Sequence, residues 1–105
     1  MNVLFICSLN HIRSLTAEQL FCAYPNLHVK SAGTQQNARV VVNPKLLTWA
    51  DKIFVMERHH KEKIEASFPY AVKDKTVFVL DIPNGFGYMD PELIDMLKSE
   101  VDSYL

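Results

Sequence analysis

The sequence has little of three features that would each define a class of protein: cysteine, long apolar runs and an excess of one charge. It contains 2 cysteines among 105 residues, too few for a disulfide framework. No apolar stretch approaches the roughly 20 residues of a membrane-spanning helix, and the apolar run at positions 3–6 is too short for a secretory signal. The net charge of −1 argues against electrostatic binding to nucleic acid or to an anionic membrane.

These absences favour a cytoplasmic protein with a hydrophobic core of its own. Hydrophobic residues make up 49% of the chain, and its length is that of one domain, so we expect a single domain over residues 1–105. We find no repeat, low-complexity segment or linker. In a reducing compartment both thiols stay free. We expect Cys22 to lie in the core, because it extends the apolar face of the helix predicted after Ser14.

Segments with strand and helix patterns alternate along the chain. Short apolar runs at 3–6, 27–31, 52–56 and 77–80 favour strands, and the segments 14–24, 43–50, 57–68 and 90–105 favour helices. This order predicts an α/β fold with a four-stranded parallel sheet, doubly wound, with helices on both faces. Ligands bind at the carboxyl ends of the strands in such sheets, and Cys7 and Asp81 both fall at these ends.

The segment from Cys7 to Arg13 follows the first predicted strand and leads into a helix. We expect its backbone N–H groups to converge on one point, together with the positive end of the helix dipole. The guanidinium of Arg13 adds a planar donor that fits two oxygens of a phosphate. Such positive surroundings favour the thiolate form of a cysteine. The spacing therefore predicts a nucleophilic Cys7 rather than a small buried side chain, in a phosphate-binding loop made of Ser8, Leu9, Asn10, His11, Ile12 and Arg13.

These residues resemble the low-molecular-weight protein tyrosine phosphatases, and most of all their short, compact members. That family carries Cys-x-Gly-Asn-x-x-Arg-Ser-Pro after its first strand, and Cys7, Asn10, Arg13 and Ser14 stand in register with it. Leu9 and Leu15 replace the glycine and the proline. The resemblance implies hydrolysis of a phosphorylated substrate through a cysteinyl-phosphate on Cys7, without a metal or cofactor. It also implies that Arg13 binds the phosphate and that the loop is supported by Asn10, Ser14 and Ser31.

The general acid and the substrate mouth are the places where the sequence departs from the family. The family has Asp-Pro after its fourth strand, and Asn84-Gly85 falls at that position. We expect Asp81 to protonate the leaving group instead, with Asp90 as the alternative, although the setting of Asp90 fits a helix cap. By position, the residues expected at the substrate mouth are Asn37, Phe86 and Tyr88.

Several alternatives stay open at the level of sequence. The resemblance places phosphotyrosine first among substrates, whereas a polar mouth would admit polyol, inositol or sugar phosphates. A phosphate-binding domain with an impaired acid is the alternative to an enzyme. His11 lies in the loop and either meets the substrate or faces solvent, and we expect His59 and His60 on a solvated helix face rather than at a metal. The sequence predicts no oligomeric state.

Overall fold

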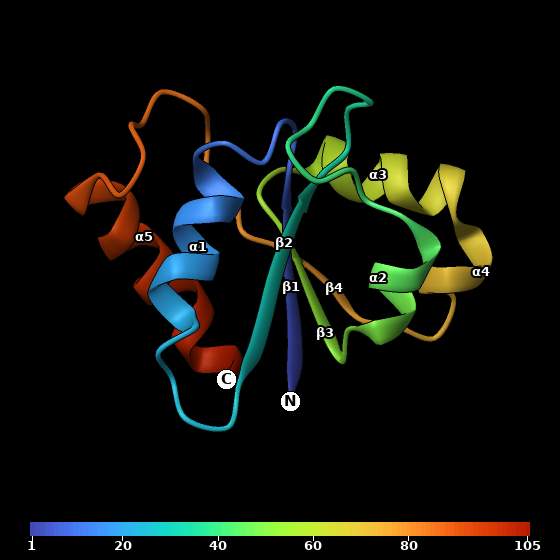
Figure 1. Ribbon diagram of the computed structural model, residues 1–105, viewed down its shortest axis with the longest axis horizontal. Coiled ribbons are helices and arrows are strands. Elements are labelled where there is room, and N and C mark those ends of the chain that lie inside the picture. Colours follow the sequence, from blue (N-terminus) through green and yellow to red (C-terminus); the bar gives the residue numbers. More distant parts are fainter.

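The strand β1 (Asn2–Cys7) lies at the centre of the sheet, and five of its six residues are buried. The computed structural model describes all 105 residues. β1 pairs in parallel with β2 (His28–Gly33) on one side and with β3 (Lys52–Val55) on the other, and β4 (Val77–Val79) pairs in parallel with β3. The strand order is therefore β2-β1-β3-β4 (Figure 1), and the predicted four-stranded parallel sheet is confirmed.

Helices cover both faces of this sheet, as the doubly wound prediction requires (Figure 1). One face is covered by α1 (Arg13–Phe21) and α5 (Pro91–Val101), which continues into the 3₁₀ turn η1 (Asp102–Tyr104). The other face is covered by α2 (Pro44–Trp49), α3 (Arg58–Ser67) and α4 (Pro69–Val72). None of these helices combines the length and the apolar character needed to cross a membrane.

The helix boundaries follow from capping residues and prolines. The side chain of Asn43 accepts a hydrogen bond from the N–H of Leu46 (2.9 Å), and that of Asp90 accepts one from the N–H of Glu92 (2.9 Å). Asp90 therefore caps α5, as its sequence setting indicated. A separate α4 follows α3, because Pro69 disfavours the helical conformation at the preceding residue, which has φ −134°.

β1 contributes to both hydrophobic layers, because successive side chains of a strand point to opposite faces. Phe5 lies in the layer under α1 and α5, stacked between Phe21 (5.4 Å between ring centroids) and Phe54 (5.3 Å). Leu4 and Ile6 lie in the layer under α2, α3 and α4. Burial on both faces explains why the strand has no polar residue between Val3 and Cys7.

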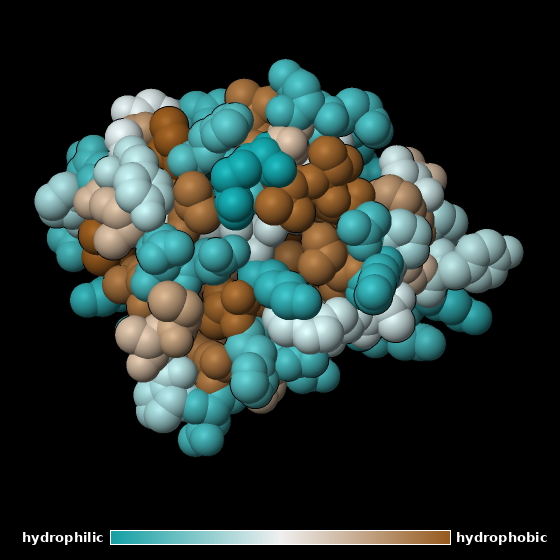
Figure 2. All heavy atoms as spheres, viewed as in Figure 1, coloured by the Kyte–Doolittle hydropathy of each residue, from teal (hydrophilic) through white to brown (hydrophobic).

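β2 is an edge strand, but a later segment of the chain covers its carboxyl end. The N–H of Gly33 donates to the carbonyl of Val40 (2.8 Å), and the N–H of Val42 donates to the carbonyl of Gly33 (2.9 Å). Figure 2 views the molecule from this edge and shows apolar side chains between β2 and α2, with hydrophilic ones around them. The covering segment fixes the end of β2 that lies beside Cys7.

Candidate active site

A loop of five residues connects Cys7, the last residue of β1, to Arg13, the first residue of α1. Its bend depends on Asn10, which is fully buried and adopts the left-handed conformation with φ 61°. The side-chain amide of Asn10 donates to the hydroxyls of Ser14 (2.7 Å) and Ser31 (2.9 Å). Three side chains expected to support the loop therefore form one buried hydrogen-bond network.

Four successive carbonyl groups, from Cys7 to Asn10, point outward and accept hydrogen bonds from the segment 34–39. The four bonds run from Thr34 N to Cys7 O (2.9 Å), Gln35 N to Ser8 O (3.1 Å), Arg39 N to Leu9 O (2.9 Å) and Arg39 Nε to Asn10 O (3.2 Å). In a trans peptide the N–H points away from the preceding carbonyl, so the amides of residues 8–11 turn inward. Within the loop, the N–H groups of Ser8, Leu9, His11 and Ile12 donate to no protein atom.

Gly33 is required for the close contact between β2 and this loop. A Cβ atom at position 33 would lie 2.4 Å from the carbonyl oxygen of Ser8 and 2.6 Å from the Cβ of Ala38. Both distances are far below van der Waals contact. The absence of a side chain therefore lets the segment 34–39 approach the phosphate-binding loop closely enough to bind its carbonyls.

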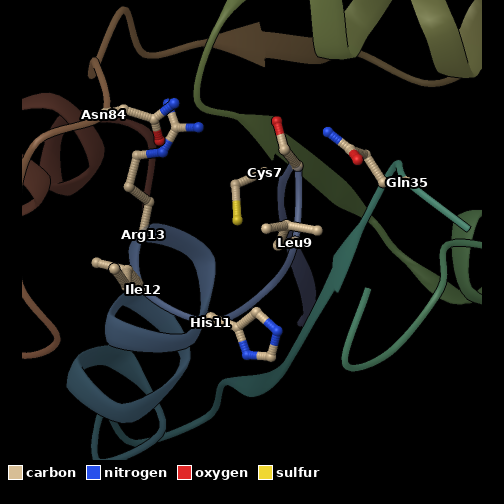
Figure 3. Close-up of a pocket in the computed structure, with 8 residues that line it drawn as sticks. Cys7, Leu9, His11, Ile12, Arg13, Gln35 and Asn84 are labelled. Carbon is tan, nitrogen blue, oxygen red and sulfur yellow. The ribbon is translucent and has the colours of Figure 1, made fainter. Parts of the chain in front are cut away.

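The sulfur of Cys7 lies at the floor of the inward-facing amides. Cys7 is 3% exposed, and its Sγ accepts a hydrogen bond from the N–H of Asn10 (3.3 Å) and lies 3.0 Å from Oγ of Ser14. Figure 3 shows the sulfur pointing into the ring formed by the loop. The N–H of Asn10 stabilises a negative charge on the sulfur, as a nucleophilic thiolate needs, and the Ser14 hydroxyl lies close enough to donate to that charge.

Arg13 is held in place by two acceptors outside the loop. Its Nη1 donates to Oε1 of Glu57 (3.0 Å) and to the carbonyl oxygen of Ile82 (2.8 Å), and the residue is 3% exposed. Burial raises the pKa of the Glu57 carboxyl, but hydrogen bonds from His59 and Arg13 and the charge of Arg13 outweigh burial and lower that pKa below its usual value. Glu57 therefore stays ionised, and the remaining N–H groups of Arg13 are free for a ligand.

The loop opens into a cavity of about 210 Å³, large enough for a phosphate group (Figure 3). Its walls are formed by Cys7, Ser8, Leu9, His11, Ile12, Arg13, Gln35 and Asn84. In Figure 3, Asn84 lies on the Arg13 side of the cavity and Gln35 on the opposite side. No carboxyl group lines the cavity, so its fixed charge is that of Arg13 and it fits an anion.

The residues expected around the leaving group lie elsewhere. Asp81 is exposed, with φ 57°, and does not line the cavity, whereas Asn84 does. The residues expected at the mouth are also absent from the walls: Asn37 and Tyr88 are exposed, and Phe86 is half-buried against the core. The polar wall opposite Arg13 comes instead from Gln35.

Two sequence predictions are wrong. Cys22 is exposed, because it ends α1 on the outer side of the helix while its neighbour Phe21 turns into the core. His60 is not on a solvated face but fully buried, with Nε2 2.9 Å from Oγ of Ser8. The burial of His60 was not predictable from its polar neighbours in the sequence, because it depends on how α3 packs against the loop.

Glu57, His59 and His60 bring their donor atoms within 4.8 Å of one another, which raises the question of a metal site. The carboxylate of Glu57 already accepts from Arg13 and contacts His59. Both ring nitrogens of His60 are engaged, Nδ1 with the N–H of Glu57 (3.0 Å) and Nε2 with Ser8. These contacts make the cluster a support for the loop and leave no free set of ligands.

No protein-family model matches the chain, and no curated protein matches it. Solved structures do. The YwlE arginine phosphatase from Geobacillus stearothermophilus is similar with a TM-score of 0.78 and 23% identity, over 98% of this chain and 89% of that one. The tyrosine phosphatase Wzb from Escherichia coli K30, in complex with phosphate, is similar with a TM-score of 0.76 and 19% identity, over 98% of this chain and 94% of that one. The low-molecular-weight protein tyrosine phosphatase from T. tengcongensis is similar with a TM-score of 0.75 and 21% identity, over 100% of this chain and 99% of that one. The chain therefore has the α/β fold of the low-molecular-weight protein tyrosine phosphatases.

Proposed function

We propose that residues 1–105 form one phosphatase domain that hydrolyses phosphomonoesters through a covalent phosphate on Cys7. One observation carries this proposal: the sulfur of Cys7 lies at the floor of a loop whose Ser8, Leu9 and His11 amides are unpaired and face inward, and the guanidinium of Arg13 lines the same cavity. Amides and a guanidinium in fixed positions stabilise the charge that builds up on phosphoryl oxygens in the transition state. The same arrangement, without the sulfur, would only bind phosphate.

In the proposed reaction the Cys7 thiolate attacks phosphorus in line with the leaving group. The S–P bond forms while the bond from phosphorus to the leaving oxygen breaks, and that oxygen takes up a proton. Water then attacks phosphorus, the S–P bond breaks, and inorganic phosphate and the thiolate are released. Ser14 stabilises the thiolate, and Asn10 and Ser31 keep the loop in the shape that the two steps share.

The leaving group decides which esters react fast. The general-acid role of Asp81 stays a prediction, with Asp90 the alternative, since neither carboxyl lines the cavity and Asp90 caps α5. A positioned acid contributes roughly 10²–10⁴ in rate, and alkoxides need it more than phenolates. We therefore expect aryl phosphates to be hydrolysed much faster than alkyl phosphates.

Phosphotyrosine is our first choice of substrate, because it is an aryl phosphate and because Wzb, one of the similar structures, is named a tyrosine phosphatase. Another similar structure is that of YwlE arginine phosphatase as a C7S mutant with a phosphorylated active-site serine, which supports a covalent intermediate by analogy. The polar walls formed by Gln35 and Asn84 favour small polyol phosphates as the second candidate. We further propose a cytoplasmic location, where both free thiols stay reduced.

The test compares a panel of aryl and alkyl phosphates on the wild type, on Cys7→Ser and on Cys22→Ser. Cys22 is the matched control, because it is the other free thiol and is exposed outside the cavity. We expect Cys7→Ser to abolish turnover and Cys22→Ser to leave it unchanged. Wild-type protein that binds phosphate without turnover on any ester would favour the phosphate-binding alternative.

A further inference from the structure

His60 connects the first turn of α3 to the phosphate-binding loop. It is the third residue of α3 and is fully buried. Its Nδ1 lies 3.0 Å from the N–H of Glu57, and its Nε2 lies 2.9 Å from Oγ of Ser8. His60 thus touches both the residue that caps α3 and the first residue of the loop.

These contacts determine where the imidazole carries its proton. The backbone N–H of Glu57 is a donor in every state, so Nδ1 must accept and cannot carry hydrogen. In the neutral ring the proton is then on Nε2, which donates to Oγ of Ser8. Burial, with smaller effects from the charges of His59, Arg13 and Lys63, lowers the pKa of His60 to about 4, although the charge of Glu57 acts to raise it. The ring is therefore neutral at ordinary pH.

The same turn of α3 also holds Arg13, at the other end of the loop. Glu57 binds Nη1 of Arg13 through its carboxylate and His60 through its backbone N–H. One helical turn therefore fixes the guanidinium through Glu57 and the first loop residue through His60. Displacing either contact would disturb the spacing between the amides and the guanidinium.

Ser8 is held from two sides. Its hydroxyl is bound by His60, and its carbonyl accepts from the N–H of Gln35 (3.1 Å). The plane of the peptide between Ser8 and Leu9 is set by that carbonyl, and the side-chain bond fixes the Cα from which the plane starts. Together they direct the N–H of Leu9 toward the cavity.

We propose that His60 is a positioning residue for phosphate binding and phosphoryl transfer, acting through Ser8 on the inward-facing amides. The inference rests on the proposed phosphatase function and goes beyond it by assigning a role to a histidine outside the cavity. The competing explanation is that His60 only caps α3. The two explanations differ in which ring nitrogen matters: Nε2 for positioning through Ser8, and Nδ1 for capping through Glu57.

Two substitutions of His60 separate the contacts of the two ring nitrogens. Asparagine places an acceptor near the position of Nδ1 and nothing near Nε2. His60→Asn therefore retains the bond from the N–H of Glu57 and loses the bond to Ser8. Glutamine places an amide N–H near the position of Nε2, so His60→Gln retains the bond to Ser8. Ser8→Ala removes the same bond from the other side and leaves the cap of α3 intact.

The experiment measures kcat and KM with p-nitrophenyl phosphate, affinity for vanadate and the thermal midpoint for the wild type and these variants. We expect His60→Asn and Ser8→Ala to lower kcat and vanadate affinity by similar factors, up to about 10²-fold for a loop displaced by an ångström. The double variant that combines His60→Asn with Ser8→Ala should lose no more kcat and vanadate affinity than either single variant. His60→Gln should retain most of the wild-type activity.

The inference is overturned if His60→Asn keeps wild-type kcat and vanadate affinity, if losses in the two single variants multiply in the double variant, or if activity follows the thermal midpoint alone. Failure of the proposed function is a different result. It would show as wild-type protein whose turnover does not depend on Cys7, whatever the His60 variants do.

Discussion

Stability between neutral and acidic pH tests the buried environment of His60 directly. The perturbation is a fall in pH, compared between the wild type and His60→Asn. Burial holds the pKa of His60 at about 4 in the folded protein, against 6.5 for an ordinary histidine. The unfolded chain therefore binds the proton first as the pH falls, and protonation favours unfolding.

The magnitude follows from that difference. Stability that His60 contributes is fully present above pH 6.5 and is lost as the pH falls toward about 4, where the folded protein also binds the proton. Since one pH unit corresponds to about 1.4 kcal/mol, the loss amounts to at most about 3 kcal/mol. This is a large part of the stability of a small domain.

The assay is urea unfolding of both proteins at a series of pH values from about 7 to about 4. Carboxyl groups common to both proteins cancel in the difference between their free energies of unfolding. We expect the wild type to lose about 3 kcal/mol relative to His60→Asn over this window. Parallel pH profiles for the two proteins would refute the assignment of a buried, neutral His60.

Four further substitutions test the core, the loop and the leaving-group side. Phe5→Ala removes a fully buried ring stacked between two others, and we expect urea unfolding to show a loss of about 3–5 kcal/mol; a loss near zero would contradict the packing. Gly33→Ala places a Cβ 2.4 Å from the carbonyl of Ser8, so calorimetry should show weaker vanadate binding, and unchanged affinity would contradict the close contact. Asn84→Asp places a carboxyl in the cavity wall, and alkyl phosphate hydrolysis should rise by about 10²-fold or more while Asp81→Asn changes it less; the reverse order would support Asp81 as the acid.

Regular elements were predictable from the sequence because their signals are local. The apolar run from Val3 to Ile6 is short, contains β-branched residues and has no polar interruption, which is typical of a strand buried on both faces. The caps at Asn43 and Asp90 are read from one side chain and the proline after it. The spacing of Cys7 and Arg13 placed both residues at one cavity, because a strand end, a short loop and a helix start leave little freedom.

Positions that depend on irregular backbone or on distant packing were not predictable. The segment after β4 has positive φ at Asp81, Gly85 and Met89, so counting residues from the strand end does not tell which side chain reaches the cavity. The burial of His60 arises from contact with Ser8, 52 positions earlier in the chain. The outward carbonyls of the loop likewise depend on the segment 34–39, whose polar sequence carries no signal of that role.

The proposed reaction depends on a phosphate that the sulfur of Cys7 carries during turnover. The most direct measurement is rapid acid quenching of wild-type protein during hydrolysis of p-nitrophenyl phosphate, followed by mass spectrometry of its peptides. We predict a phosphate on the peptide that contains Cys7, formed as fast as the burst of nitrophenol, and none on the peptide that contains Cys22. Steady turnover with no phosphate on Cys7 at any time would contradict this covalent route.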